Sequence, residues 1–374
     1  MDITKYFKEK VVEVINKESI ENENSRRPYI IGLMNDRREE SKVIEVFSMS
    51  NYRGAIMPIV ARGKTPSHDS FAPVKLDKLS LMHFFVEAAH TEYTIAWATK
   101  KINSMKGQGA SESDMEDLIA EIYSKLYLDR IIRLQDLLAY QVGQCLSNFT
   151  LDSNPGFISS GLIKNSDIYQ YKVEGLDAVI DGLEMNPLNS NMPSYNPIKY
   201  LLDRLVNTSR SEPNQIWMGD YWASWFLNNP AWKEMHPTKL MLEHKMKYTP
   251  AGTSSEVDAL GANLLYDYNG IKFVHITKKA TLFDNEGNKI TRPVFNPNSI
   301  ISLNTETLGS TVYSPVYQKP RTGVTIISNN EKMNFYEVPQ EGFPEKDGLY
   351  RSEGWCLGAI LGTDSIQRMT MAGV

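Results

Sequence analysis

The longest regular pattern of hydrophobic and polar positions lies between Ser111 and Asn148. No Pro occurs in this stretch, and its first Gly is Gly143. Ser113 and Glu116 have the spacing of a capping box, in which two side chains satisfy backbone N–H groups at a helix start. The pattern predicts one amphipathic helix over residues 113–146, roughly 50 Å long at about 1.5 Å per residue. Its apolar positions recur at helical spacing: Met115, Ile119, Ile122, Leu126, Leu134, Leu137 and Leu138.

A second helical pattern occupies residues 1–20, where Ile3, Phe7, Val11, Val14 and Ile15 recur with charges between them. Because acidic residues interrupt its polar face, the pattern favours an arm that docks on protein over a membrane anchor. The polar residues 21–27 predict a linker. Within it, Arg26 and Arg27 could contact phosphate, but two basic residues are more often solvated.

The pattern from Tyr29 to about Thr91 is that of extended chain. Val43–Phe47 is a strand candidate, and the apolar run Ala55–Val60 contains Pro58, which cannot donate to a strand ladder. Turn-forming residues fill positions 62–70, and residues 71–80 alternate apolar and polar. Together they predict a long two-stranded ribbon with a polar tip. Because an isolated ribbon is marginally stable in water, we expect it to lie on a neighbouring subunit.

Shorter elements follow the ribbon. A helix is predicted over His83–Asn103, and a second α/β unit is predicted from Asn196, with a helix, a buried strand and an aromatic-rich helix. The clearest hairpin has Asn269-Gly270 at its turn, the preferred pair for a type I′ turn. Further strands are expected at these positions, the last of them pairing with strands already built: 299–303, 311–317, 324–328 and 350–361.

Composition narrows the class of protein. A chain of 374 residues with 41% hydrophobic and 23% charged residues has room for two or three folded domains. A net charge of −5 does not support a dedicated nucleic-acid binder. Two isolated cysteines offer no disulfide framework, and charges occupy the N-terminal positions where a signal peptide needs an apolar core. No apolar run approaches the ~18 residues of a membrane span. We expect a soluble protein of a reducing cytoplasm, with no membrane contact.

No pattern of catalytic or metal-binding residues stands out. The segment 107–112 resembles a Gly-rich phosphate loop, but it lacks the third Gly and the preceding strand, so a linker and helix cap explain it better. His68, Asp69 and Ser70 are consecutive, whereas a catalytic triad converges from separate segments. The six histidines never take metal-ligand spacing. We therefore predict no catalytic residue, no metal site and no cofactor.

The densest aromatic cluster allows two interpretations. It could stack on a sugar or a base, and a carbohydrate-active site there would use Asp220 and Glu234 as its paired carboxylates. At helix-like spacing such a cluster is more often core or subunit interface, which we favour. Its members are Trp217, Tyr221, Trp222, Trp225, Phe226 and Trp232.

Two stretches carry a family resemblance. One is IMPIVARGKTPS (56–67) followed by FAPVKLDKLSLMHFF (71–85), an apolar P-hydrophobic-V-x-R-G segment, a small-residue tip and an extended run. The other is DYNGIKFVHIT (267–277) followed by DNEGNKI and FNPNSIISLNTETLG (295–309), then Tyr313. In this order they resemble the major capsid proteins of tailed double-stranded DNA bacteriophages, which have the Hong Kong 97-type fold. Within that fold the sequence is most similar to the family that includes the phage lambda coat protein.

The resemblance implies an α+β chain in which a ribbon, the E-loop, projects from a peripheral domain with a long spine helix. A separate axial domain follows. The self-cross-linking chemistry of some family members is not implied, because its residues have no match here. The implied ranges are an N-terminal arm 1–28, an extended segment 29–90 with the E-loop at about 48–79, a peripheral domain 91–194 with the spine helix 113–146, an axial domain 195–344, and a C-terminal strand within 345–374 that returns to the peripheral domain.

By the same resemblance, copies of the chain would form the hexamers and pentamers of an icosahedral shell around phage DNA, contacted without sequence specificity. Scaffold, portal and decoration proteins would be further partners. The location would be the virion capsid, after assembly in the host cytoplasm. An encapsulin-like compartment and, less favoured, a carbohydrate-binding or carbohydrate-active protein remain as alternatives. The expected inter-subunit contacts lie on the ribbon: Ile56, Met57, Ile59, Val60, Arg62, Phe71, Val74 and Leu76.

Overall fold

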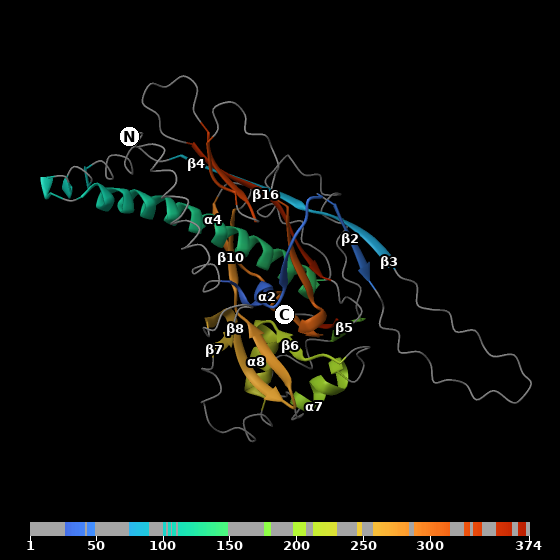
Figure 1. The fold of residues 1–374 in the computed structure, drawn as a ribbon. Helices are drawn as coiled ribbons and strands as arrows, with labels where there is room; N and C mark the ends of the chain where they lie inside the picture. Colours follow the sequence, from blue (N-terminus) through green and yellow to red (C-terminus); the bar gives the residue numbers. More distant parts are fainter. Residues whose placement is uncertain are drawn as a thin grey trace, which may run out of the picture.

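The computed structural model describes most elements of the chain, and the structural statements below concern only the described residues. These are 27–41, 43–48, 75–89, 100–101, 104–105, 107–109, 111–148, 176–180, 197–206, 212–229, 245–248, 257–283, 288–314, 325–329, 332–338, 349–360 and 366–371. The expected helical arm over residues 1–20 lies outside them. No helix in the described part is long and apolar enough to cross a membrane. The mixture of helices and sheets confirms the α+β prediction (Figure 1).

A six-stranded sheet forms the upper part of the molecule in Figure 1. Its order is β1–β13–β16–β15–β14. β13 and β15 pair with successive parts of one edge of the long strand β16, and β4 pairs with its opposite edge. All neighbours are antiparallel except β1 and β13, which are parallel. The strands are β1 (Asn35–Arg38), β4 (Met82–Ala89), β13 (Gly309–Ser314), β14 (Thr325–Asn329), β15 (Asn334–Val338) and β16 (Leu349–Ile360).

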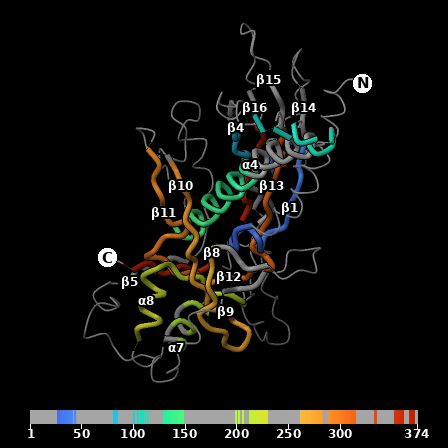
Figure 2. The backbone as a smooth tube through the Cα atoms, turned by 90° about the vertical axis from the view of Figure 1, so that its left-hand side faces the viewer, coloured from blue at the N-terminus to red at the C-terminus, as the bar shows by residue number. Residues whose placement is uncertain are grey.

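A seven-stranded sheet forms the lower part, in the order β5–β17–β12–β6–β9–β8–β7. Two separate two-stranded sheets, β2–β3 (Figure 1) and β10–β11 (Figure 2), complete the described strands. The bounds are β2 (Val43–Ser48), β3 (Lys75–Ser80), β5 (Leu176–Ile180), β6 (Gln215–Met218), β7 (Lys245–Tyr248), β8 (Val257–Tyr268), β9 (Ile271–Ile276), β10 (Lys279–Phe283), β11 (Lys289–Pro293), β12 (Ser299–Leu303) and β17 (Gln367–Met371).

Helices cover both faces of the seven-stranded sheet. Ile216 and Met218 of β6 face a core made with helices α7 and α8, whereas Trp217, between them, faces a core made with α2 and α4. This alternation follows from the two-residue period of a strand. The helices are α2 (Tyr29–Gly32), α4 (Glu112–Asn148), α7 (Pro197–Leu201) with the π-helix η1 (Leu202–Val206), α8 (Asp220–Asn228) and the 3₁₀ turn η3 (Thr305–Thr307).

The predicted long helix is confirmed as α4, but it begins at Glu112, one residue before the predicted start at Ser113. Ser111 Oγ accepts a hydrogen bond from the backbone N–H of Asp114 at 3.3 Å, and Asp114 Oδ2 accepts one from the N–H of Ser111 at 2.9 Å. The capping pair is therefore Ser111 with Asp114, and the predicted pair of Ser113 with Glu116 is wrong. Both pairs have capping spacing, and the earlier one adds backbone hydrogen bonds to the helix without losing a cap.

The C-terminal half of α4 packs on β16 through an exceptionally close approach. A Cβ added to Gly358 would lie 2.2 Å from Cγ2 of Val142. The buried side chain of Gln141 pairs with the same glycine, accepting from its N–H at 2.8 Å and donating to its carbonyl at 3.3 Å. Since β4 pairs with β16 only as far as Cys356, Gln141 takes the place of a strand partner beyond that point.

One expectation about this region needs correction. The helix predicted from His83 is wrong over residues 83–89, because these residues form β4, where aromatic and β-branched side chains suit a strand. Strands β13–β15, which lie within 195–344, belong to the six-stranded sheet, and β17, which lies within 345–374, belongs to the seven-stranded one. The assignment of these ranges to axial and peripheral domains stays a prediction. β13 begins at Gly309, a position that requires glycine. Its φ is +143°, and a Cβ there would lie 1.9 Å from the carbonyl oxygen of Ala359.

The predicted hairpin is confirmed as β8–β9. Asn269 and Gly270 both have positive φ, 51° and 85°, as a type I′ turn requires. We expect Gly270→Ala to lower the free energy of unfolding by about 1 kcal/mol, because an L side chain is strained there although no atom lies within 4 Å. Gly107→Ala is the matched control: it also has open space, but its φ is not positive. Urea denaturation would compare them, and equal effects would contradict the turn geometry.

Candidate functional site

The residues that the structure describes form no metal-binding cluster. Among them, no three His, Cys, Asp or Glu side chains are placed to hold a metal ion. Cys145 and Cys356 are free and buried, and burial raises the pKa of both thiols, so they stay protonated and unreactive. The segment His68–Ser70 lies outside the described residues. The remaining candidates for a functional site are two histidine–carboxylate pairs, the aromatic cluster, one cleft and the ribbon.

Two histidine–carboxylate pairs join neighbouring elements. His83 Nε2 lies 2.9 Å from Glu353 Oε1, between β4 and β16, and the His83 ring packs on Trp355 with centroids 4.5 Å apart. His275 Nε2 lies 2.8 Å from Asp220 Oδ1, between β9 and α8. Asp220, one of the two carboxylates required by the carbohydrate hypothesis, is therefore in a pair that ties α8 to the sheet.

The aromatic cluster is core. Trp217, Trp222, Trp225 and Phe226 have at most 1% of their surface exposed. The indole N–H of Trp222 donates to the carbonyl of Asn298 at 2.8 Å, and that of Trp217 donates to Gln215 Oε1 at 2.7 Å. No ring face of these four side chains is open to a sugar or a base. The core interpretation is confirmed for these four. Tyr221 is 40% exposed, so it is not part of the core, and Trp232 and Glu234 lie outside the described residues.

One open cleft of about 470 Å³ lies beside the C-terminal end of α4. Its amides are engaged with one another: Asn148 Nδ2 donates to Gln144 Oε1 at 2.6 Å, and Asn296 Nδ2 donates to Asn148 Oδ1 at 2.6 Å. Gln144 Nε2 donates to the carbonyl of Val294 at 3.0 Å. These bonds attach the end of α4 to the chain that enters β12, so the cleft walls have a structural role.

The ribbon predicted between residues 48 and 79 has its base in the described part. β2 and β3 pair antiparallel from Val43↔Ser80 to Ser48↔Lys75, and neither pairs with another described sheet. Figure 1 shows them leaving the body on the side away from the N-terminal end of α4. Of the eight expected contact residues, Leu76 lies in β3 opposite Phe47, and the other seven lie outside the described residues. The inter-subunit role of all eight stays a prediction.

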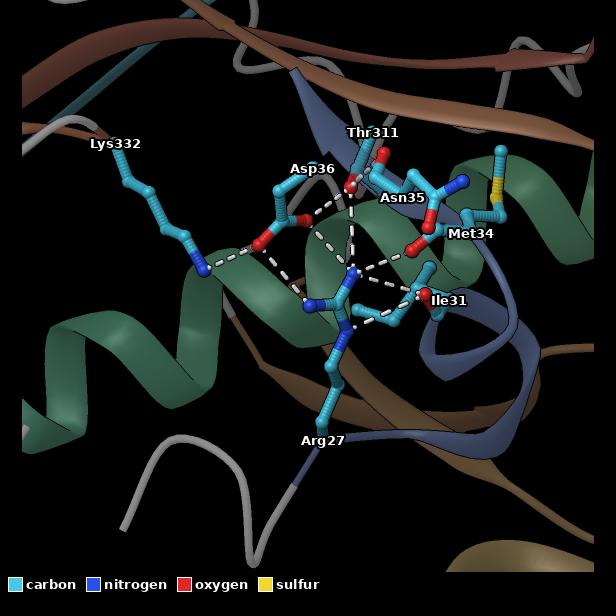
Figure 3. A network of polar contacts seen from close by, with 7 residues as sticks. All are labelled: Arg27, Ile31, Met34, Asn35, Asp36, Thr311 and Lys332. Carbon is cyan, nitrogen blue, oxygen red and sulfur yellow. Dashed lines mark hydrogen bonds and ion pairs between the residues drawn. The ribbon is translucent and has the colours of Figure 1, made fainter. Parts of the chain in front are cut away.

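A polar network that the sequence did not reveal lies at the root of this ribbon (Figure 3). The guanidinium of Arg27 donates to both carboxylate oxygens of Asp36, at 2.7 and 3.0 Å, and to the carbonyls of Ile31 and Met34, both at 3.0 Å. Lys332 Nζ lies 2.8 Å from Asp36 Oδ2 on the other side. The prediction that Arg27 is a solvated linker residue is therefore wrong, because only 11% of its side chain is exposed.

Asp36 is the centre of the network. Thr311 of β13 donates its hydroxyl to Asp36 Oδ1. Burial alone would raise the pKa of Asp36, but the charges of Arg27 and Lys332 and their hydrogen bonds hold it below its ordinary value of 3.8. Sequence patterns could not find this network, because Lys332 is far along the chain from Arg27 and Asp36, and the three residues follow no helical or strand period.

Neither a family model nor a curated protein matches the chain. Several solved structures, in contrast, are similar to it. A prophage protein of Escherichia coli CFT073, provisionally assigned as a capsid protein, superposes with a TM-score of 0.56 at 10% identity, covering 96% of this chain and 97% of that one. The capsid of cyanophage A-1(L) gives 0.43 at 11% identity, with 90% of each chain covered.

The SrpI encapsulin of Synechococcus elongatus PCC 7942 gives a TM-score of 0.37 at 10% identity, covering 90% of this chain and 85% of that one. Of the three similarities, only the one to the prophage protein is close enough to support a conclusion about the fold. It spans nearly the whole of both chains and agrees with the order of ribbon, long helix and two sheets described above. The chain thus has the Hong Kong 97-type fold of phage capsid proteins.

Proposed function

We propose that the chain is a major capsid protein, whose copies form the hexamers and pentamers of an icosahedral shell around phage double-stranded DNA. The observation that carries this proposal is the ribbon base β2–β3, which projects from a body of capsid fold and pairs with no other described sheet. A two-stranded ribbon is marginally stable alone, so a neighbouring copy is its natural cover. Repeated contacts of this kind close into rings and shells.

In this proposal α4 is the spine helix, and the six-stranded sheet with α4 makes most of the peripheral domain. The seven-stranded sheet with α7 and α8 makes most of the axial domain. The ribbon is the E-loop, with the eight residues named above as its contacts. The family that includes the phage lambda coat protein remains our assignment within the fold, on the motifs at 56–85 and 267–309.

The remaining parts of the proposal follow from a shell that encloses DNA. A net charge of −5 suits an inner surface that contacts DNA without sequence specificity, because strong attraction to phosphate would hinder packing. Scaffold, portal and decoration proteins would be partners of the shell. Its place would be the virion, after assembly in the host cytoplasm. A structural role of this kind needs no catalytic residue and no cofactor.

Negative-stain electron microscopy of the purified full-length protein tests the proposal. We expect uniform closed particles tens of nanometres wide, alone or after addition of the phage's other head proteins. Particles that protect double-stranded DNA from nuclease would support a phage head, whereas particles that enclose protein cargo would support the encapsulin-like alternative. A protein that stays monomeric under all these conditions would contradict both.

A further inference from the structure

The two roots of the β2–β3 ribbon are held very differently. On one side β3 continues through the buried Leu81 into β4, which pairs with the long strand β16 over all its residues, from Met82 to Ala89. On the other side β2 is reached from β1, which pairs only with β13, from Asn35 to Arg38. The β3 root therefore continues into a pairing of eight residues, whereas β1, which leads to β2, has a pairing of four. Near both roots one side chain is buried in the core, Leu81 after β3 and Ile44 in β2.

The pairing of β1 with β13 is extended by one hydrogen bond just after the strand, from the N–H of Glu39 to the carbonyl of Tyr313 at 2.8 Å. All four of its residues are exposed, so apolar burial contributes little to its position. It has a hydrogen-bonding neighbour on one side only. Short exposed edge strands of this kind are among the first parts of a fold to open locally.

The network of Figure 3 compensates for this weakness. Asp36 lies on β1 and forms ion pairs on two sides. One partner is Arg27, which precedes α2 in the chain, and the other is Lys332, which precedes β15. Helix α2, adjacent to Arg27, is held independently, because Tyr29, Ile30 and Ile31 are buried in the core next to α4. Arg27 and Lys332 thus belong to the body of the molecule, whereas Asp36 belongs to the strand that leads to the ribbon.

We propose that Asp36, Arg27 and Lys332 form a latch that keeps β1 on the six-stranded sheet and so sets the direction in which the ribbon leaves the body. When the latch opens, β1 separates from β13, and the ribbon turns about its fixed root at β3–β4. Helix α2 and the rest of the sheet stay in place. The latch is a device of the single chain and does not depend on shell formation.

The latch is sensitive to acid. The charged groups that face Asp36 are Arg27 and Lys332; β13 contributes the neutral Thr311, and on β1 itself Arg37 pairs with Glu39. Because the pKa of Asp36 is lower in the folded chain than its ordinary 3.8, the latch contributes fully at pH values above the ordinary one. Its contribution falls as the pH drops from there through the folded pKa.

The test compares Asp36→Asn with Glu39→Gln, a change of the same chemistry three residues along the chain. Spin labels are placed on Val43→Cys and Ser224→Cys, both at exposed positions, while the buried Cys145 and Cys356 are inaccessible to label. In the unassembled full chain at pH 7, we expect Asp36→Asn to broaden the distance distribution between the two labels. Glu39→Gln should leave this distribution as in the unsubstituted protein.

A second readout is cleavage by trypsin after Arg37 and Arg38, which β1 pairing protects. We expect the cleavage rate to rise about tenfold or more in Asp36→Asn, since hydrogen bonds to charged groups are the stronger class. Unchanged distances and an unchanged cleavage rate in Asp36→Asn would overturn the proposal.

If Asp36→Asn does not fold, the labelled protein with its native Asp36 decides. Its distance distribution should broaden reversibly as the pH falls below about 4, while the circular dichroism of the body is retained. A distribution that stays narrow until the whole chain unfolds would overturn the latch. Because every measurement uses unassembled protein, its failure is distinct from a failure of the proposed shell.

Discussion

Deletion of residues 62–70, the predicted tip of the ribbon, is expected to abolish shell formation while leaving a folded monomer. Stable interfaces between protein copies bury about 1,600 Å² in total, and a ribbon laid on a neighbour supplies much of such an area. Without its tip the ribbon can no longer span that neighbour. The body should survive, because the two described core clusters draw on α2, α4, α7, α8 and the strands of the two large sheets.

Electron microscopy and light scattering would measure assembly of the deletion variant, and circular dichroism with thermal denaturation would measure its fold. Gly270→Ala is the control: it changes a turn in the seven-stranded sheet and should still form shells. Normal shells from the deletion variant would show that the ribbon assignment is wrong. Ile59→Asp then tests a single proposed contact in a ribbon of full length, with loss of assembly as the expected result.

Gly358→Ala is expected to cost about 3 kcal/mol of unfolding free energy, at the upper end of the range for overpacked cores. The added Cβ would lie 2.2 Å from Cγ2 of Val142, so α4 and β16 must move apart. That movement also weakens the two hydrogen bonds between Gln141 and the backbone of Gly358. A buried N–H and C=O left without partners would add about 1–3 kcal/mol.

A double-mutant cycle with Val142→Ala measures the cause of this loss. Val142→Ala removes the methyl group that the new Cβ would meet, so Gly358→Ala should cost less in that background, with a coupling of at least about 1 kcal/mol. Chemical denaturation of the four proteins supplies the numbers. Gly107→Ala, with nothing within 4 Å, controls for the general effect of the exchange. A cost that is the same with and without Val142 would contradict the close approach of helix and strand.

Much of the local structure could be predicted. The helix over 113–146 has the bounds 112–148 in the structure, because its apolar period is long and uninterrupted. Asn269 and Gly270 adopt the expected turn, since few other pairs tolerate two positive φ angles. The helical spacing of Trp222, Trp225 and Phe226 indicated a buried face, which the structure has. In each case, the signal lies within a few neighbouring residues.

Other features could not be predicted, because their partners are far apart in the chain. The residues 83–89 become a strand through pairing with β16, which begins some 260 positions later in the sequence. Strands β13–β15 join β4 and β16 rather than β12, although they follow β12 directly. Arg27 forms an ion pair with Asp36, which also pairs with the distant Lys332, whereas the linker pattern alone favoured a solvated Arg27.

By itself, then, the sequence determined the long helix, the position of the tightest turn and the burial of Trp222, Trp225 and Phe226, because backbone propensity and apolar period act over short distances. Only the tertiary structure decided which strands share a sheet and which charges meet at the root of the ribbon. Those choices depend on backbone hydrogen bonds and ion pairs between segments that are mostly far apart in the chain, and such bonds leave no period in the order of residues.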